Sequence, residues 1–580
     1  MNELTADILI FGSGGAGMFA ALHAADAAPG LEIAMVVKGL FGKSGCTRMV
    51  QGGYNAVLNP EDSLDRHFSD TIDGGAWINN QELAWALVNG APDRIRELEE
   101  RCGAYFDRNA DGSIHQKAFG GQTFDRTVHR GDLTGIEIIA RLSDQVMARP
   151  NIRILEEMRA VDLLNARDGD GVGGALLLDV RSGGFVVARA RATLIATGGG
   201  ARIYRFSSPS VEKSGDGVAL AFEAGVPLVD MEMLQFHPTG LLAGNSILTG
   251  SVVEEGLRGA GGRLLNADGE RFMERYDPER LERSTRDVVS RAMYHEVSDG
   301  RGTPNGGVLL DMSHLGREFV AKNFPGMCER ARMVDRDLTS EPIEVCPTSH
   351  FHMGGAVIDV DCGTEREGLF VAGEDAGGVH GANRLGGNGV ADSTVFGARA
   401  GDHLAAYAPS RALPSISESE VGERVSEATA PLGRTGSENP FALRSELGDL
   451  MWDHVGVVRD EVRLRTGLDC LQTLDERLRR VGVSGSPAYN LTWQETLNLR
   501  SLLVVGEATA RASLERTETR GSHCRSDYPE RDDDRWLRNV VLRRGEDGME
   551  ASTIEVRFTR LTPGAGGLPG IQTADVSVGG

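Results

Sequence analysis

The stretch at residues 6–17, ADILIFGSGGAG, constrains the possible fold of this chain more than any other feature. Its apolar residues 8–11 predict a buried parallel strand, and the alanine-rich residues 16–27 predict a helix directly after it. Between them lies Gly12-x-Gly14-x-x-Gly17, in which the glycines permit a tight turn, approach of a pyrophosphate, and close helix–strand packing. This order of strand, glycine turn and helix predicts a Rossmann-like nucleotide-binding domain at the N-terminus.

The next predicted strand, at residues 31–38, completes a βαβ unit and ends at Lys38. NAD-binding proteins usually place Asp or Glu near this point to hold the ribose hydroxyls, so Lys38 weakens an NAD interpretation. A polar, glycine-rich loop follows and includes Ser44, Thr47 and Gly53. A loop of this kind lets a flat ring system lie against the backbone.

The chain is long and acidic, and both properties limit its function. Its 580 residues exceed what one core can hold and predict about three or four domains. Its 61 basic and 84 acidic residues give a net charge of −23, which argues against nucleic acid or an anionic membrane surface as a direct partner. An anionic substrate is still allowed, because local arginines can form a positive pocket inside an acidic protein.

Targeting and cysteine patterns favour a cytoplasmic chain. No apolar run reaches the length of about 18 residues that indicates a transmembrane helix. The N-terminus enters the first predicted strand within about five residues, so no signal peptide is expected. The seven cysteines are scattered and form no CxxC pair, so we expect no disulfide framework, iron–sulfur cluster or other metal site in this chain.

The order of predicted elements indicates a domain inserted into the nucleotide-binding domain. Strands and helices alternate up to about residue 240, but the pattern changes and the charge increases over about residues 241–344. Residues 350–400 return to glycine-rich strand and helix patterns, so the nucleotide-binding domain is predicted to be discontinuous. A linker at residues 408–417, a mostly helical segment at 419–514 and a tail of short strands are expected to follow.

Several longer motifs occur in a specific order along the chain. They are HPTG at 237–240, STRDVVSR at 284–291, PTSHFHMGG at 347–355, HGANRLGGN at 380–388, and RGSH at 520–523 with DYPERDD at 527–533. In this order they resemble the flavoprotein subunits of the succinate dehydrogenase and fumarate reductase family, which also includes L-aspartate oxidase. The resemblance extends over nearly the whole chain.

The resemblance implies an α/β fold that binds FAD rather than NAD. It implies a Rossmann-like FAD-binding domain interrupted by a capping domain, then a helical domain and a small C-terminal domain. The corresponding boundaries are 1–240 and 350–414 for the FAD-binding domain, 241–349 for the cap, 415–520 for the helical domain and 521–580 for the C-terminal domain.

The turn, the loop and the resemblance together nominate a set of FAD-binding residues. These are Gly12, Gly14, Gly17, Lys38, Ser44, Thr47, Gly53, Asp216, Glu374 and Asn388. Many respiratory members of the family attach FAD through a histidine in a Ser-His-Thr motif, but here the stretch reads Gly45-Cys46-Thr47. We therefore expect non-covalent FAD, with a cysteinyl link through Cys46 as the alternative.

The catalytic residues follow from the resemblance and from the chemistry of a carbon–carbon double bond between two carboxylates. Its reduction needs a hydride from reduced flavin, a proton donor, and cations that hold both carboxylates. The resemblance makes His237, His350 and Arg384 the carboxylate-binding residues and Arg286 the proton donor. Phe119 is expected to form a wall of the pocket, and Glu255 and Asp287 are both candidate members of a proton relay.

One position departs from the family pattern and leaves the substrate open. Glu254 stands where the family usually has a threonine that touches a substrate carboxylate, and two like charges there are unfavourable unless one is protonated or paired. Either Glu254 points elsewhere, or the substrate is not a plain dicarboxylate at that end. An aspartate substrate is an example of the latter, because its ammonium group would lie near Glu254.

The resulting functional prediction is a flavoprotein subunit that interconverts fumarate and succinate, or a close dicarboxylate. It is expected to exchange electrons with an iron–sulfur partner and to reach the inner face of a membrane only through partner subunits. L-Aspartate oxidase, or a related FAD-dependent oxidoreductase acting on a modified dicarboxylate, is the alternative. The complete set of His237, Arg286, His350 and Arg384 argues against a flavin-binding protein without enzymatic activity.

Overall fold

The computed structural model describes residues 1–564 except 168, 170 and 547, and its centre is a seven-stranded sheet. The strand order is β6-β2-β1-β9-β8-β7, and β16 pairs with β9. Parallel pairs join β6 (Ile152–Glu156), β2 (Ile33–Val37), β1 (Asn2–Phe11), β9 (Gly184–Ile195) and β16 (Leu369–Val371). Because β16 follows the predicted insert, residues from both sides of the insert contribute to one sheet.

The first strand and helix form close to where the sequence predicts them. The apolar residues of β1 are buried, and α1 (Gly15–Ala27) begins directly after the glycine turn. Gly12 has φ +104°, and a Cβ there would lie 2.1 Å from the carbonyl oxygen of Ala196. A Cβ at Gly17 would lie 2.1 Å from the carbonyl oxygen of Gly12, so only glycine lets the helix pack this closely on the turn.

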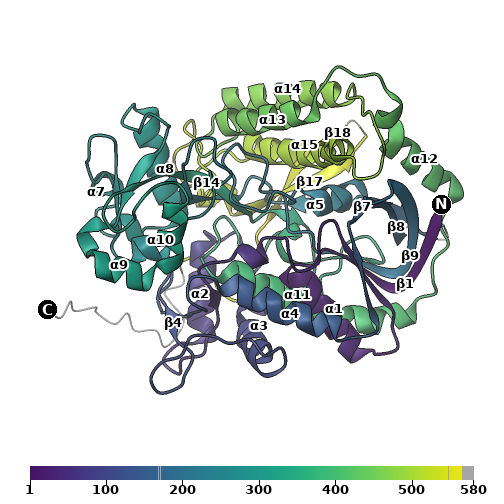
Figure 1. Cartoon of the computed structure of the whole chain (residues 1–580), viewed down its shortest axis with the longest axis horizontal. Helices are drawn as coiled ribbons and strands as arrows, with labels where there is room; N and C mark the ends of the chain where they lie inside the picture. Colours follow the sequence, from purple (N-terminus) through teal and green to yellow (C-terminus); the bar gives the residue numbers. More distant parts are fainter. Residues whose placement is uncertain (168, 170, 547, 565–580) are drawn as a thin grey trace.

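Helices and an antiparallel extension complete the FAD-binding domain. Helix α1 packs against α11 (Asn388–Tyr407) and α4 (Thr134–Met147), and α11 also packs against α3 (Gln81–Glu100), next to α2 (Leu64–Gly74) (Figure 1). The sheet continues through β8 (Val172–Asp179) and β7 (Met158–Asn165). A small sheet of order β3-β5-β4 lies outside it and consists of β3 (Tyr54–Asn55), β5 (Thr127–Val128) and β4 (Gln116–Lys117).

The insert has its own sheet and its own hydrophobic core, and its helices lie together on the left of Figure 1. The sheet has the order β11-β14-β13-β12, with β11 (Leu234–Leu241), β14 (Ile343–His352), β13 (Val308–Asp311) and β12 (Arg263–Leu265). The helices are α6 (Gly256–Gly259), α7 (Met273–Tyr276), α8 (Arg286–Ser298), α9 (Arg317–Asn323) and α10 (Pro325–Arg332). The chain enters the insert along β11 and leaves it along β14, so these paired strands connect it to the FAD-binding domain.

Helices dominate the segment after the linker, as the sequence predicts, and they lie along the top of Figure 1. They are α12 (Glu418–Thr429), α13 (Pro440–His454), α14 (Glu461–Leu478) and α15 (Leu491–Glu515). Helix α15 packs against α5 (Asp216–Glu223), which begins at the predicted cofactor-binding residue Asp216. No helix within the described part of the chain combines the length and the apolar character needed to cross a membrane.

The described part of the C-terminal segment joins the FAD-binding domain instead of folding around a sheet of its own. After α16 (Asp533–Trp536), the hairpin of β17 (Arg538–Gly545) and β18 (Gly548–Glu555) extends a sheet that begins with β15 (Gly355–Ala356) and β10 (Leu228–Val229). Residues 565–580 of the predicted C-terminal domain lie outside the described residues.

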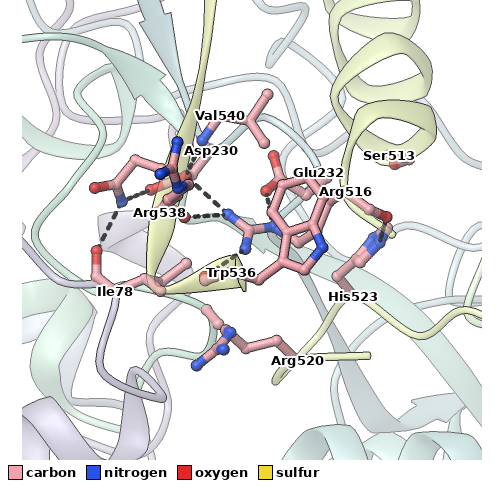
Figure 2. A network of polar contacts seen from close by, with 12 residues as sticks. Ile78, Asp230, Glu232, Ser513, Arg516, Arg520, His523, Trp536, Arg538 and Val540 are labelled. Carbon is pink, nitrogen blue, oxygen red and sulfur yellow. Dashed lines mark hydrogen bonds and ion pairs between the residues drawn. The ribbon is translucent and has the colours of Figure 1, made fainter. Parts of the chain in front are cut away.

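A buried network of charged residues fastens this hairpin to the end of α15 (Figure 2). The Arg516 guanidinium is fully buried and donates to Glu232 Oε1 at 2.6 Å, to Glu518 Oε1 at 2.9 Å and to the carbonyl oxygen of Arg538 at 2.7 Å. Glu518 also accepts from Arg520 Nε at 2.6 Å. The motif residues 520–533 therefore contribute to the packing of the C-terminal hairpin.

Candidate active site

One cavity of about 810 Å³ extends from the glycine turn after β1 to the inserted domain. The carboxyl ends of parallel strands form one side of it, which is where ligands bind in open α/β sheets. Its other end is closed by residues of β11, of β14 and of the segment just before α6. The cavity is thus shared between the nucleotide-binding fold and the insert.

Eight of the ten residues predicted to hold FAD line this cavity. They are Gly12, Gly14, Lys38, Ser44, Thr47, Gly53, Asp216 and Glu374. The Thr47 hydroxyl accepts from the backbone N–H of Gly15 at 3.1 Å, which ties the polar loop to the start of α1. Cys46 precedes it on the same wall, so the position predicted to lack a linking histidine does face the cavity.

Lys38 and Asp216, which were predicted separately, contact each other. Lys38 Nζ donates to Asp216 Oδ2 at 2.9 Å and to Ser214 Oγ at 2.6 Å. Arg159, which sequence reasoning missed, donates to Asp216 Oδ1 at 2.7 Å. Burial opposes ionisation of Asp216, but Arg159 and Lys38 outweigh it and hold the pKa of this carboxyl below its ordinary value. Lys38, Asp216 and Arg159 form a partly buried ionic cluster at the wall.

Two predicted cofactor residues are not on the wall. Gly17 packs under the turn, as described above. The Asn388 side chain is fully buried and lies between Asn55, at 2.7 Å, and His67, at 3.0 Å. Its predicted direct contact with the cofactor is therefore not supported by this arrangement. Gly387 and Gly389 beside it do line the cavity, so the N-terminus of α11 faces the cavity through its backbone, where its dipole favours negative charge.

The residues predicted to be catalytic come together at the other end of the cavity. Arg286 is the first residue of α8, and Arg384 lies in the loop before α11. Both donate to Oε1 of Gln235 on β11, at 2.9 Å from Arg286 and 3.1 Å from Arg384. Gln235 was not predicted, although it stands two residues before His237, directly ahead of the HPTG motif. Its carbonyl oxygen holds the two guanidiniums side by side.

Two histidines from paired strands stand beside these arginines. His237 on β11 and His350 on β14 have ring centroids 5.3 Å apart. The Ser208 hydroxyl lies 2.8 Å from His350 Nδ1, and the Thr239 hydroxyl lies 3.2 Å from His237 Nδ1. Burial and then Arg286 lower the pKa of both histidines well below the ordinary value. Both rings are therefore neutral at pH 7 and can donate a hydrogen bond to a ligand.

Glu255 bridges Arg286 and a third arginine. Its Oε2 accepts from Arg286 Nε at 3.0 Å, and its Oε1 accepts from Arg258 at 3.0 Å. Burial opposes ionisation, but Arg286 and Arg258 outweigh it and hold the pKa of Glu255 at about 2. Arg258 was not predicted. The other candidate relay residue, Asp287, instead contacts Asn383 at 3.0 Å, and no contact joins it to this chain of three groups among the described residues.

The doubtful position, Glu254, faces the cavity, but it is paired. Its carboxylate accepts from Lys117 Nζ at 2.7 Å. Lys117 lies on β4, outside the insert, and its Nζ is 5.7 Å from the ring centroid of Phe119, which lines the cavity as predicted. Sequence reasoning found the unusual carboxylate but not its partner. The second unpredicted lysine, Lys213, forms an ion pair with Glu374.

The shape and donor groups of the cavity fit a dinucleotide cofactor with a small substrate at its end. At Gly45 and Gly198 an added Cβ would touch no protein atom, although both residues line the cavity. These glycines leave space that a flat ring can occupy against the backbone. Within the described residues, no group of three or more His, Cys, Asp or Glu side chains is arranged to hold a metal ion.

The chain matches known families and proteins over most of its length. The FAD binding domain family matches residues 7–390, and the fumarate reductase flavoprotein C-terminal family matches residues 444–567. The chain is 45% identical to a subunit of the CoM/CoB fumarate reductase of Methanothermobacter marburgensis, over 93% of this chain and 97% of that protein.

Solved structures show the same architecture. A variant of E. coli quinol fumarate reductase superposes with a TM-score of 0.92 at 34% identity, covering 97% of this chain and 98% of that one. Mycobacterium smegmatis Sdh1 in complex with UQ1 superposes with a TM-score of 0.87 at 38% identity, covering 97% and 96%.

Proposed function

The chain belongs to the family of fumarate reductase and succinate dehydrogenase flavoprotein subunits, and we propose that it interconverts fumarate and succinate or a close dicarboxylate. It is an FAD-dependent oxidoreductase with a Rossmann-like FAD-binding domain.

The charge at the catalytic end of the cavity carries this proposal. Arg258, Arg286 and Arg384 bring three guanidiniums, and Glu255 brings one carboxylate. The neutral histidines and the Lys117–Glu254 pair add no net charge, so the groups around Gln235 and Glu255 together carry a formal charge of +2. A dicarboxylate carries the opposite charge, and guanidiniums suit carboxylates because they donate two parallel hydrogen bonds.

Arg384, His237 and His350 are proposed to hold the two carboxylates of the substrate. When bound, FAD supplies the hydride for one carbon of the double bond. Arg286 then donates the proton to the other carbon, while the surrounding cations stabilise the negative charge that develops there. Glu255 contacts both Arg286 and Arg258, so it can pass a proton from Arg258 to Arg286 and restore the donor.

The glycine turn, the polar loop and the Lys38–Asp216 cluster are proposed to hold FAD without a covalent bond. Cys46 stands where many relatives carry the linking histidine, and burial raises the pKa of its thiol, which keeps it in the less nucleophilic protonated form. Acid precipitation of the holoenzyme is expected to leave a colourless pellet and a yellow supernatant. A yellow pellet would show a covalent bond and contradict this part of the proposal.

An iron–sulfur protein is proposed as the electron partner, and any membrane contact is proposed to be made through partner subunits. The M. marburgensis relative is itself named as one subunit of an enzyme, which supports a complex of more than one chain. L-Aspartate oxidase is less well supported, because Lys117 already supplies Glu254 with the cation that a substrate ammonium would provide.

Stopped-flow mixing tests the substrate directly. The holoenzyme is reduced, mixed with fumarate, mesaconate or iminoaspartate, and followed by flavin absorbance. We expect rapid reoxidation by fumarate and slower reoxidation by mesaconate, whose extra methyl group must fit beside Phe119. Reoxidation by iminoaspartate alone, or hydrogen peroxide release from L-aspartate by the isolated chain, would favour the oxidase.

A further inference from the structure

Glu254 places a carboxylate at the end of the cavity where the guanidiniums of Arg286 and Arg384 lie. Only 3% of the residue is exposed, and it lines the same cavity as Arg286, Arg384 and the two histidines. An unpaired carboxylate at this point would repel one end of a dicarboxylate substrate, and low exposure makes the repulsion stronger than in bulk water.

Lys117, which lies outside the insert, neutralises the negative charge of Glu254. Its ammonium group lies 2.7 Å from Glu254 Oε1, and its side chain is 22% exposed, so the ion pair is largely shielded from solvent. The lysine reaches the pair from β4, whereas Glu254 belongs to the segment just before α6. The two residues are 137 positions apart and meet only because the insert lies against the small sheet.

We propose that Lys117 is a specificity-determining residue that neutralises Glu254, so that this wall of the cavity accepts a carboxylate. The inference rests on the proposed function, because it concerns the same substrate site. The pair contributes no net charge and leaves the +2 of the arginine cluster available to the substrate. Removing Lys117 alone lowers that charge to +1 and places an unpaired carboxylate at the cavity wall.

The competing explanation is that the ion pair only fastens the insert to the rest of the chain. Another contact across the same boundary offers a matched control: the backbone N–H of Gly326 on α10 donates to Asp132 Oδ2 at 3.0 Å. Asp132 does not belong to the cavity wall. Asp132→Asn therefore weakens the attachment of the insert without changing the charge of the substrate site.

A cycle of Lys117→Met, Glu254→Thr and the double variant separates these explanations. Each holoenzyme is compared by its FAD-to-protein ratio and by KM and kcat for fumarate and for its half-amide, which is neutral at one end. Lys117→Met is expected to raise the KM for fumarate by about tenfold to a hundredfold, because the unpaired Glu254 repels the dianion. Its kcat and its KM for the half-amide are expected to change by less than about twofold.

Recovery of the KM for fumarate in the double variant is the decisive observation. The double variant is expected to return the KM for fumarate to within about twofold of the wild type, because it removes the repelling carboxylate as well. Lys117→Arg is expected to behave like the wild type, and Asp132→Asn is expected to leave both KM values unchanged. A double variant as impaired as Lys117→Met, or an equal loss for fumarate and the half-amide, would overturn the specificity role.

The measurements on the wild type distinguish a failure of this inference from a failure of the proposed function. If the wild type reduces fumarate and the double variant is not rescued, the role of Lys117 is wrong and the proposed function stands. If the wild type reduces no dicarboxylate, both are wrong.

Discussion

Two buried carboxylates, Glu255 and Glu518, each accept from two guanidiniums, yet only Glu255 lines the cavity. Glu255 accepts from Arg258 and Arg286, both at 3.0 Å, at the catalytic end of the cavity. Glu518 accepts from Arg516 at 2.9 Å and from Arg520 at 2.6 Å, beneath the C-terminal hairpin. Each carboxylate thus bridges two guanidiniums away from bulk water.

The two regions differ in charge balance and in access to a ligand. Around Glu518 the positive groups have further partners, because Arg516 also contacts Glu232 (Figure 2) and Arg520 also contacts Asp533 at 2.8 Å. Near Glu255, Arg384 donates to the neutral Gln235 side chain and to a backbone carbonyl, and its guanidinium lies 4.4 Å from the Phe351 ring centroid, but no hydrogen bond joins it to a carboxylate among the described residues. Burial and then Arg286 lower the pKa of Arg384 to about 9, because both disfavour its charged form.

The comparison teaches that buried charge alone does not identify a functional site. A balanced network without an adjoining cavity can stabilise the fold, whereas an excess of one charge on a cavity wall needs a ligand of the opposite charge. If the two regions differ in this way, substitutions at the cavity lower turnover, whereas substitutions beneath the C-terminal hairpin lower stability.

Arg286→Lys is expected to abolish most turnover. Lysine keeps the charge but cannot reach Glu255 and Gln235 together, so kcat should fall by about a thousandfold, within the range for a lost proton donor. The FAD content should stay unchanged. The matched control is Arg291→Lys on the same helix, where the arginine contacts Asp287 at 3.2 Å and should tolerate the change. Normal turnover in Arg286→Lys would exclude its role as proton donor.

Glu255→Gln is expected to impair turnover, whereas Glu518→Gln is expected to lower the stability of the fold. Glu255→Gln should lower kcat by about a hundredfold, because an amide cannot relay a proton between the two arginines. Glu518→Gln should lower the free energy of unfolding by about 3 kcal/mol, because it leaves buried guanidiniums without their carboxylate. Turnover per bound FAD should stay normal in Glu518→Gln. Urea unfolding and steady-state kinetics on both variants check the separation, and a shared loss of turnover would refute it.

His523, in the network beneath the C-terminal hairpin, is predicted to make the stability of the protein depend on pH. It is fully buried, its Nδ1 accepts from Arg459 at 2.8 Å, and burial followed by Arg459 lowers its pKa well below the ordinary value. Below about pH 6.5 the unfolded chain binds a proton that the folded chain excludes, so stability is complete above that pH and falls as the pH decreases.

The size of the effect can be isolated by substitution. Wild type should lose about 1.4 kcal/mol per pH unit more than His523→Gln between about pH 6.5 and 5, because only the wild type carries this histidine. Urea titrations at several pH values measure the difference. Parallel slopes in the two proteins would show that His523 is not the group responsible.

Much of the fold could be predicted because its signals are local. An apolar run, three spaced glycines and an alanine-rich helix specify β1, the turn and α1 from neighbouring residues alone. The long motifs likewise placed His237, Arg286, His350 and Arg384 in one set, and the structure brings all four to one cavity. The position of the C-terminal hairpin could not be predicted, because β17 pairs with β10, which is far away in the sequence.

The family, the nucleotide-binding turn and the nature of the catalytic side chains can all be read from short stretches of sequence. The packing of distant segments, in contrast, set which charges meet: it joined Lys38 to Asp216, gave Glu255 rather than Asp287 the bridging position, and turned Asn388 away from the cavity. It also paired Glu254 with Lys117. The physical reason is distance along the chain, because backbone propensities act between neighbours, whereas an ion pair depends on how separate elements pack.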